Sequence, residues 1–145
     1  MQIDDAKEEI KRADHLIYVS LKYTRTCDIM QNIFKRLVAA YDHAILASLE
    51  KAKEQGKTEF IPNSKMLKAE SLYRLKRKFK EHLDLYFFMK KVGASDFGRR
   101  EEYRKHVTML CYITEEKIVE INVPQVMEYF EKTKLFINDV EEYLG

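Results

Sequence analysis

Apolar residues recur along most of this chain at the three- and four-residue spacing of an α-helix, with polar residues between them. The spacing predicts a first helix over about residues 4–23, whose acidic first turn suits the positive end of the helix dipole. A second helix is expected to begin after Thr26, a good N-cap residue, and to continue to about Gln55, where Gly56 ends it.

The pattern continues after a short extended linker over residues 57–62. Asn63 is a good N-cap for a third helix that reaches about Val92, and Gly93 would stop it. The second and third helices would then form a long helical hairpin at the centre of the fold.

The pattern is less clear between Ser95 and Pro124. A fourth helix is expected to begin at Ser95 or Asp96 and to carry residues 99–106. Residues 107–123 are rich in β-branched side chains, so they predict either a hairpin that turns at residues 114–116 or one short helix, and we favour the helix. Pro124 suits the first turn of a final helix, because the apolar residues after it keep helical spacing.

These elements predict one domain over residues 1–145, an all-α, up-and-down bundle of about five helices. Four glycines and two prolines leave few places for turns, which favours long helices with short loops. The two cysteines are too few for a disulfide framework or a cysteine-based zinc site, and we expect no metal and no cofactor. Without a signal pattern or a run of about eighteen apolar residues, we expect a cytoplasmic protein that does not enter a membrane.

The charge is distributed unevenly although the net charge is only +2. Residues 65–105 carry thirteen basic and six acidic side chains, whereas residues 106–145 carry three and eight. Such an asymmetry could attract an anion such as RNA to one face, or it could pair oppositely charged helices with one another.

Three residues suggest a specific chemistry in the expected fourth helix, namely Arg99, Arg100 and His106. On a helix, residues seven apart lie near the same face. Arginine holds a phosphate with two hydrogen bonds and histidine moves protons near neutral pH, so the set suits metal-independent cleavage of RNA. The alternative interpretation is an ordinary solvated helix face.

The layout resembles the HEPN (higher eukaryotes and prokaryotes nucleotide-binding) superfamily of small helical bundles. The resemblance rests on the alanines of the long hairpin, on Arg99 or Arg100 followed by His106, and on an acidic amphipathic tail. The alanines are Ala40, Ala44, Ala47 and Ala52.

Membership would imply a homodimer whose Arg/His pairs face a shared cleft, with either ribonuclease activity or a role as partner of a small nucleotidyltransferase. Glu101 and the Val107-Thr108 pair depart from the family's usual residues. We therefore expect a domain that binds RNA or nucleotides, with metal-independent cleavage of RNA as a further activity that the resemblance implies. The alternative is a non-catalytic helical module that binds a protein such as a nucleotidyltransferase.

Two further surfaces are expected from the sequence. Basic residues of the third and fourth helices have a composition that suits a nucleic-acid backbone, although a solvated face is an alternative; the expected contacts are Arg74, Arg77, Lys78, Arg104 and Lys105. The apolar run from Tyr86 to Met89 exceeds one helix stripe, which indicates a dimer contact or a helix covered on several sides, and we favour the dimer contact.

Overall fold

The computed structural model describes residues 2–145, which form five α-helices and a small three-stranded antiparallel sheet. The protein is therefore predominantly helical but not all-α. The elements in chain order are α1 (Gln2–His15), the π-helical segment η1 (Leu16–Leu21), α2 (Cys27–Glu54), α3 (Lys65–Leu75), the 3₁₀ turn η2 (Arg77–Phe79), α4 (Lys80–Ala94), β1 (Asp96–Arg100), β2 (Thr108–Tyr112), β3 (Ile118–Asn122) and α5 (Val123–Leu144).

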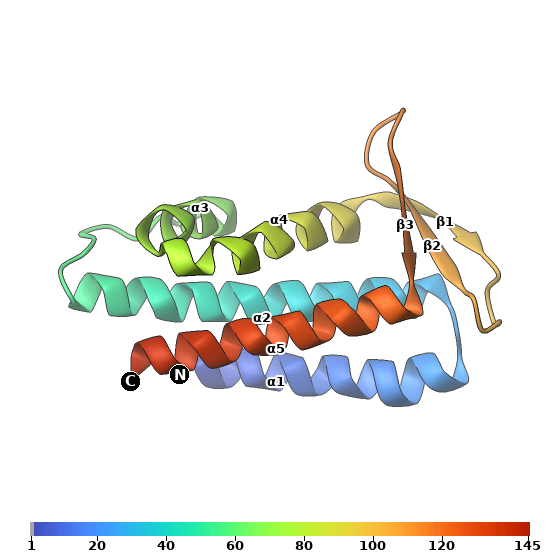
Figure 1. Ribbon diagram of the computed structural model, residues 1–145, viewed down its shortest axis with the longest axis horizontal. Coiled ribbons are helices and arrows are strands. Elements are labelled where there is room, and N and C mark those ends of the chain that lie inside the picture. Colours follow the sequence, from blue (N-terminus) through green and yellow to red (C-terminus); the bar gives the residue numbers. More distant parts are fainter. Residues whose placement is uncertain (1) are drawn as a thin grey trace.

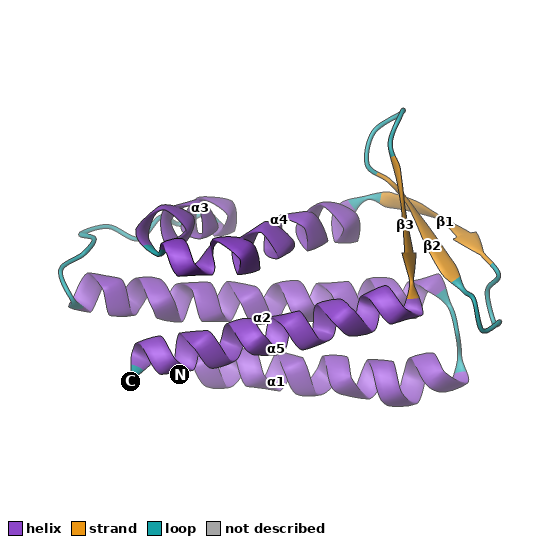
Figure 2. Cartoon of the chain, viewed as in Figure 1, coloured by secondary structure: helices purple, strands orange, loops and turns teal. Residues whose placement is uncertain are grey.

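Helices α1, α2 and α5 run along the length of the molecule, and α4 packs on α2 and α5 (Figure 1). The sheet stands at one end of this bundle, and the start of α1 and the end of α5 lie at the opposite end (Figure 2). Helix α2 contacts α1, α3, α4 and α5, so its buried face is wide. Three aromatic side chains fill the centre, where the ring of Tyr41 stacks on Phe136 at 4.6 Å and lies 5.5 Å from Tyr86.

The predicted ends of the second helix and the predicted start of the last helix are confirmed, because local capping residues set them. The Thr26 hydroxyl accepts a hydrogen bond from the Ile29 amide at 3.3 Å. Gly56 follows α2 with φ of 74°, the left-handed conformation that favours glycine after a helix. At α5, Asn122 and Gln125 form a reciprocal capping box with two 2.9 Å hydrogen bonds.

The prediction of one unbroken third helix is wrong. Lys76 leaves the helical conformation, with φ of −127° and ψ of 92°, and divides the segment into α3, η2 and α4. The N-cap of α3 is Ser64 rather than Asn63, since the Ser64 hydroxyl accepts from the Leu67 amide. The break lets Leu72 and Phe79 both be buried, while α3 takes a different direction from α4 (Figure 1). The central hairpin is therefore formed by α2 with two shorter helices.

The prediction of a fourth helix from Ser95 or Asp96 is also wrong. The preference for a helix over residues 107–123 is wrong as well. Residues 96–100 form β1, which pairs with β2, and β2 pairs with β3 as the hairpin alternative predicted. Within the sheet, Phe97 lies opposite Cys111 and Met109 lies opposite Ile121, so these side chains share the face that packs on the bundle. Cross-strand pairing and burial of this face determine the structure here.

The apolar run Tyr86–Met89 is covered by helices of the same chain. Tyr86 and Met89 are buried, Phe87 contacts Tyr73 of α3, and Phe88 contacts Tyr129 of α5. Of the two interpretations of this run, the structure supports a helix covered on several sides. Homodimerisation stays a prediction without support from this segment.

Candidate nucleic-acid interface

Arg99, Arg100 and His106 lie on a strand and a loop rather than on one helix. Neighbouring residues of a strand point to opposite faces, so the two arginines diverge from each other. His106 lies in the loop between β1 and β2, and its side chain is exposed. Among the described residues, no hydrogen bond or ring contact joins the His106 side chain to either arginine. The shared helix face from which the site was predicted is therefore absent.

The two arginines instead make ion pairs within the chain. Arg99 donates to both carboxylate oxygens of Asp28, at 2.8 and 2.9 Å, and lies 3.4 Å from Glu102. These bonds lower the pKa of Asp28 below its ordinary value and raise the pKa of the Arg99 guanidinium. Arg100 pairs with Glu120 across the sheet. Both guanidinium groups already have anionic partners, so they are poorly placed to receive a phosphate.

The β1–β2 loop is fixed to the start of α2 by further hydrogen bonds. The Glu102 carboxylate accepts from the Cys27 amide at 2.8 Å, and the Tyr103 amide donates to the Arg25 carbonyl at 2.7 Å. Arg25 in turn donates to the Lys105 carbonyl at 3.1 Å. Glu101 and Tyr103 adopt positive φ, 54° and 65°, to form this loop. The acidic and basic side chains here maintain the structure of the loop.

The other predicted contacts are spread over both ends of the molecule. Arg74 borders a hollow between α3 and α4, whereas Arg77 and Lys78 are exposed at η2. Arg104 and Lys105 are exposed in the β1–β2 loop, beside the sheet. The five residues do not form one surface, and only Arg74 belongs to the largest concave region.

That concave region consists of three adjoining hollows of about 200, 270 and 690 Å³ along α2, α3 and α4. The first and second share Asp42 and Lys65, and the second and third share Lys90 and Ala94. We call this continuous surface the basic groove. The basic side chains that line it are Lys35, Lys65, Lys68, Arg74, Lys90 and Lys91.

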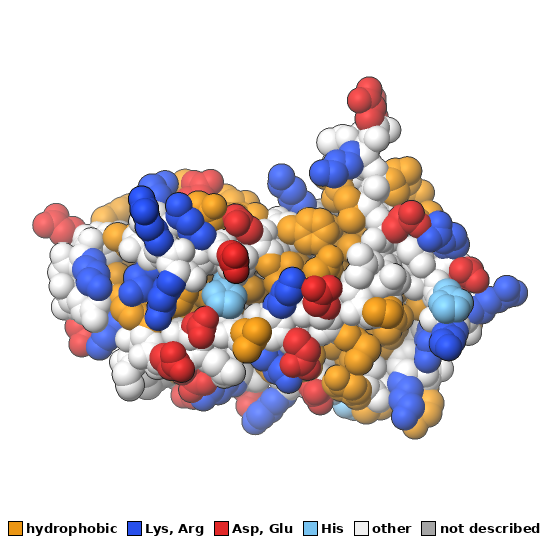
Figure 3. All heavy atoms as spheres, in the orientation of Figure 1, with side chains coloured by type: hydrophobic (Ala, Val, Ile, Leu, Met, Phe, Trp, Pro, Cys, Tyr) orange, Lys and Arg blue, Asp and Glu red, His pale blue; other side chains and the backbone are white. Residues whose placement is uncertain are grey.

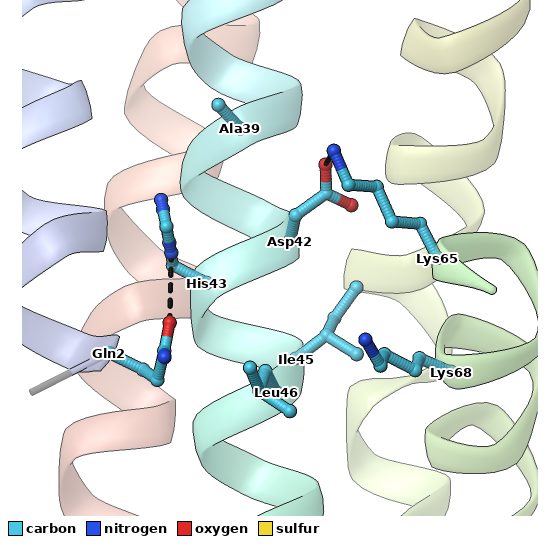
Figure 4. Close-up of a pocket in the computed structure, with 8 residues that line it drawn as sticks. All are labelled: Gln2, Ala39, Asp42, His43, Ile45, Leu46, Lys65 and Lys68. Carbon is cyan, nitrogen blue, oxygen red and sulfur yellow. Dashed lines mark hydrogen bonds and ion pairs between the residues drawn. The ribbon is translucent and has the colours of Figure 1, made fainter. Parts of the chain in front are cut away.

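The groove carries an excess of positive charge because its only acidic residues are Asp42 and Glu70. Asp42 accepts a 2.6 Å hydrogen bond from Tyr86. Its carboxylate also lies 3.8 Å from the Lys65 ammonium group (Figure 4). Lys90 donates to the Tyr86 hydroxyl at 3.2 Å. Burial, and then the hydrogen bond to Asp42, raise the pKa of Tyr86. Tyr86 therefore stays protonated and keeps the chain of polar groups in place.

Aromatic and aliphatic side chains form the floor of the groove. The rings of Tyr73 and Phe87 lie 6.1 Å apart in the largest hollow, where Arg74 and Lys91 stand beside them. Phe34 and Met89 line the hollow next to it. At the other end, His43 shares a 3.0 Å hydrogen bond with Gln2 (Figure 4). An apolar floor between positive side chains can hold a base or a ribose while the lysines hold phosphates.

Most of the groove residues were not predicted from the sequence, because they come from three separate helices. Lys35 is on α2, Lys65 and Lys68 are in the first turn of α3, and Lys90 is near the end of α4. The one available signal was the basic excess of residues 65–105, which does not show which lysines face each other.

No protein-family model, curated protein or solved structure matches this chain. The HEPN resemblance therefore stays a prediction. Within residues 2–145, no helix is both long enough and apolar enough to cross a membrane. Over the same residues, no three histidine, cysteine, aspartate or glutamate side chains are grouped so as to hold a metal ion.

Proposed function

We propose that this protein binds single-stranded RNA in the basic groove and does not cleave it there. The observation that carries the proposal is the charge of the groove, where six Lys or Arg side chains face two acidic residues. Asp42 pairs with Lys65 and accepts from Tyr86, so five basic side chains and one acidic residue, Glu70, remain. The positive charges that remain match the regular negative charge of a nucleic-acid backbone.

The shape of the groove supports a single strand. Tyr73 and Phe87 give it an aromatic floor, and unpaired bases stack on such side chains, whereas bases within a duplex cannot reach them. The hollows of the groove open to solvent, so an RNA chain can reach them from outside. The predicted HEPN resemblance agrees with RNA as the ligand.

The ribonuclease hypothesis has weaker support than binding. Arg99 and Arg100 are paired with Asp28 and Glu120, and within residues 2–145 no hydrogen bond or ring contact joins the His106 side chain to either arginine. A metal-independent cleavage would need a base and a charge-stabilising group close to one phosphate. Incubation of RNA with the wild type and with His106→Ala in EDTA tests this hypothesis, and cleavage that the variant loses would restore it.

The binding proposal is tested by the affinity for a fluorescent single-stranded RNA over a series of salt concentrations. The groove variant combines Lys35→Gln, Lys68→Gln and Lys91→Gln, three lysines without an ion pair in the described chain. We expect its affinity to fall by about tenfold or more. The slope of log affinity against log salt should decrease by about 0.7 for each phosphate that the variant no longer neutralises.

A matched control removes the same charge elsewhere, with Lys22→Gln, Lys53→Gln and Lys117→Gln. These three side chains are exposed and lie outside the groove. The control should bind nearly as tightly as the wild type. An equal loss in both variants would show that only the net charge matters. A flat salt response of the wild type would instead favour the protein-binding module.

A further inference from the structure

A second cluster of positive charge lies where η2 packs on the last turn of α5. The ammonium groups of Lys57 and Lys76 lie 5.8 and 4.1 Å from the centre of the Tyr143 ring. Those of Lys76 and Lys78 lie 6.0 and 5.5 Å from the centre of the Phe79 ring. The two rings contact each other edge to face, so three lysines surround one aromatic pair. Figure 3 shows Lys and Arg side chains gathered over α3 and the start of α4 at this end.

The three lysines repel one another without an acidic partner. None of them forms an ion pair with any residue of the described chain, and the Tyr143 hydroxyl donates to the neutral side chain of Gln55. Burial, and then the charges of Lys57 and Lys78, lower the pKa of Lys76 below its ordinary value. The two neighbouring charges disfavour the charged form of Lys76, and an anion bound beside the lysines would offset this effect.

We propose that Lys57, Lys76 and Lys78 form a binding site for adjacent phosphate groups, as in a triphosphate. Lys76 contacts both rings, and the charges of Lys57 and Lys78 act on it, so the three lysines match a ligand that carries several adjacent negative charges. The rings of Tyr143 and Phe79 hold the lysine stems in place and exclude water from one side of them. The site shares no residue with the basic groove. It therefore does not depend on the proposed RNA binding there.

Titration calorimetry with inorganic triphosphate tests the site directly. The cluster variant combines Lys57→Gln, Lys76→Gln and Lys78→Gln, and the groove variant described above is the matched control with the same loss of charge. We expect triphosphate to bind the wild type and the groove variant, and its affinity to fall by about tenfold or more in the cluster variant. The proposal is overturned if triphosphate does not bind the wild type, or if the two variants lose affinity equally.

The melting temperature of the cluster variant shows whether loss of fold explains the result, because the variant loses the contacts of the lysines with the rings as well as their repulsion. If the variant is still folded at the temperature of the titration, its lost affinity for triphosphate is a loss of the site. A second comparison identifies the source of the phosphates, with RNA oligonucleotides that carry a 5′-triphosphate or a 5′-hydroxyl. Tighter binding of the triphosphate form, lost only in the cluster variant, would show that the site holds an RNA end. Equal binding of the two forms would show that it holds a free oligophosphate.

Because RNA with a 5′-hydroxyl tests the basic groove and inorganic triphosphate tests the lysine cluster, failure of one proposal is distinct from failure of the other.

Discussion

Arg99 of β1 and Asp28 of α2 are joined by two hydrogen bonds, at 2.8 and 2.9 Å, although 71 residues separate them in the chain. The planar guanidinium group matches both oxygens of the carboxylate. A third group joins this pair, because Glu102 lies 3.4 Å from Arg99 and also accepts from the Cys27 amide. The start of the long helix and the β1–β2 loop are therefore held together by one cluster of charges.

We predict that Arg99→Lys loosens the β1–β2 loop without unfolding the protein. Lysine keeps the charge but lacks the planar pair of donors that matches both oxygens of Asp28. Amide hydrogen exchange should become faster at residues 101–106 and at Cys27, whose amide donates to Glu102. Arg100→Lys is the control, since Arg100 pairs with Glu120 on the opposite edge of the sheet. Equal protection of the loop in wild type and Arg99→Lys would contradict the prediction.

The same pair predicts a dependence of stability on acid pH. The hydrogen bonds from Arg99, and then its charge, lower the pKa of Asp28 below its ordinary value of 3.8. The pair therefore contributes its full stability above that value, and the contribution is lost as the pH falls through the lower pKa of the folded state. Asp28→Asn should lose less stability than the wild type between pH 4 and about pH 2. Denaturant unfolding over this range measures the difference, which will be small because both groups are exposed.

The sequence predicts the long helices well because their signals are local. Thr26, Gly56 and Asn122 mark helix ends with their own side chains or backbone, whatever lies nearby. The break at Lys76 has no such signal. No glycine or proline stands there, and the break is favourable because it lets Leu72 and Phe79 both reach the core.

The candidate site was harder to predict because it depends on tertiary contacts. Residues 96–106 contain several good helix formers, yet pairing with β2 makes the first five of them a strand. A strand places Arg99 and Arg100 on opposite faces, which removes the basis for a shared face with His106. In the same way, Lys35 and Lys90 approach one groove only because α2 packs on α4. The packing of α2 on α4 cannot be read from a single sequence.

Gly98 and Tyr112 give a prediction about the exposed face of the sheet. The Tyr112 side chain crosses from β2 to lie over Gly98 on β1, where its hydroxyl occupies the space of an added Cβ. Gly98→Ala should displace the ring and cost less than about 1 kcal/mol, the range of a cross-strand contact. In a Tyr112→Phe background the cost should be lower, because the atom that is closest to Gly98 is absent.

A double-mutant cycle of denaturant unfolding measures this coupling between residues 98 and 112. Identical costs of Gly98→Ala in the two backgrounds would show that the hydroxyl of Tyr112 does not contribute to it.

Tyr41 provides a prediction of increased stability. Its hydroxyl is buried and has no hydrogen bond within residues 2–145. The nearby Thr133 hydroxyl donates to the Tyr129 carbonyl at 2.7 Å, so it does not donate to Tyr41. Burial of an unpaired hydroxyl is unfavourable, so Tyr41→Phe should raise the free energy of unfolding by about 1 kcal/mol. Chemical denaturation measures the change, and a loss of stability would show that the hydroxyl has a partner.

Tyr86 differs from Tyr41 because its buried hydroxyl has hydrogen-bond partners, so its removal should lower stability. It donates to Asp42 at 2.6 Å and accepts from Lys90 at 3.2 Å. Tyr86→Phe leaves the half-buried Asp42 carboxylate with Lys65 alone, at 3.8 Å. We expect a loss of about 1–2 kcal/mol in the free energy of unfolding, the cost of a buried charged group without its donor.

The same tyrosine should also make stability fall at alkaline pH. The fold raises the pKa of Tyr86 above its ordinary value of 10.0. Its protonated hydroxyl therefore contributes its full stability below pH 10, and this contribution is lost as the pH rises from 10 towards the higher pKa of the folded state. Unfolding measurements above pH 10 should therefore show a steeper loss of stability in the wild type than in Tyr86→Phe. Tyr41 also has a raised pKa, so both compared proteins carry Tyr41→Phe and the two differ only at residue 86. Parallel curves for the two proteins would show that Tyr86 ionises as readily in the folded state as in the unfolded state, and that its bond to Asp42 is not maintained in solution.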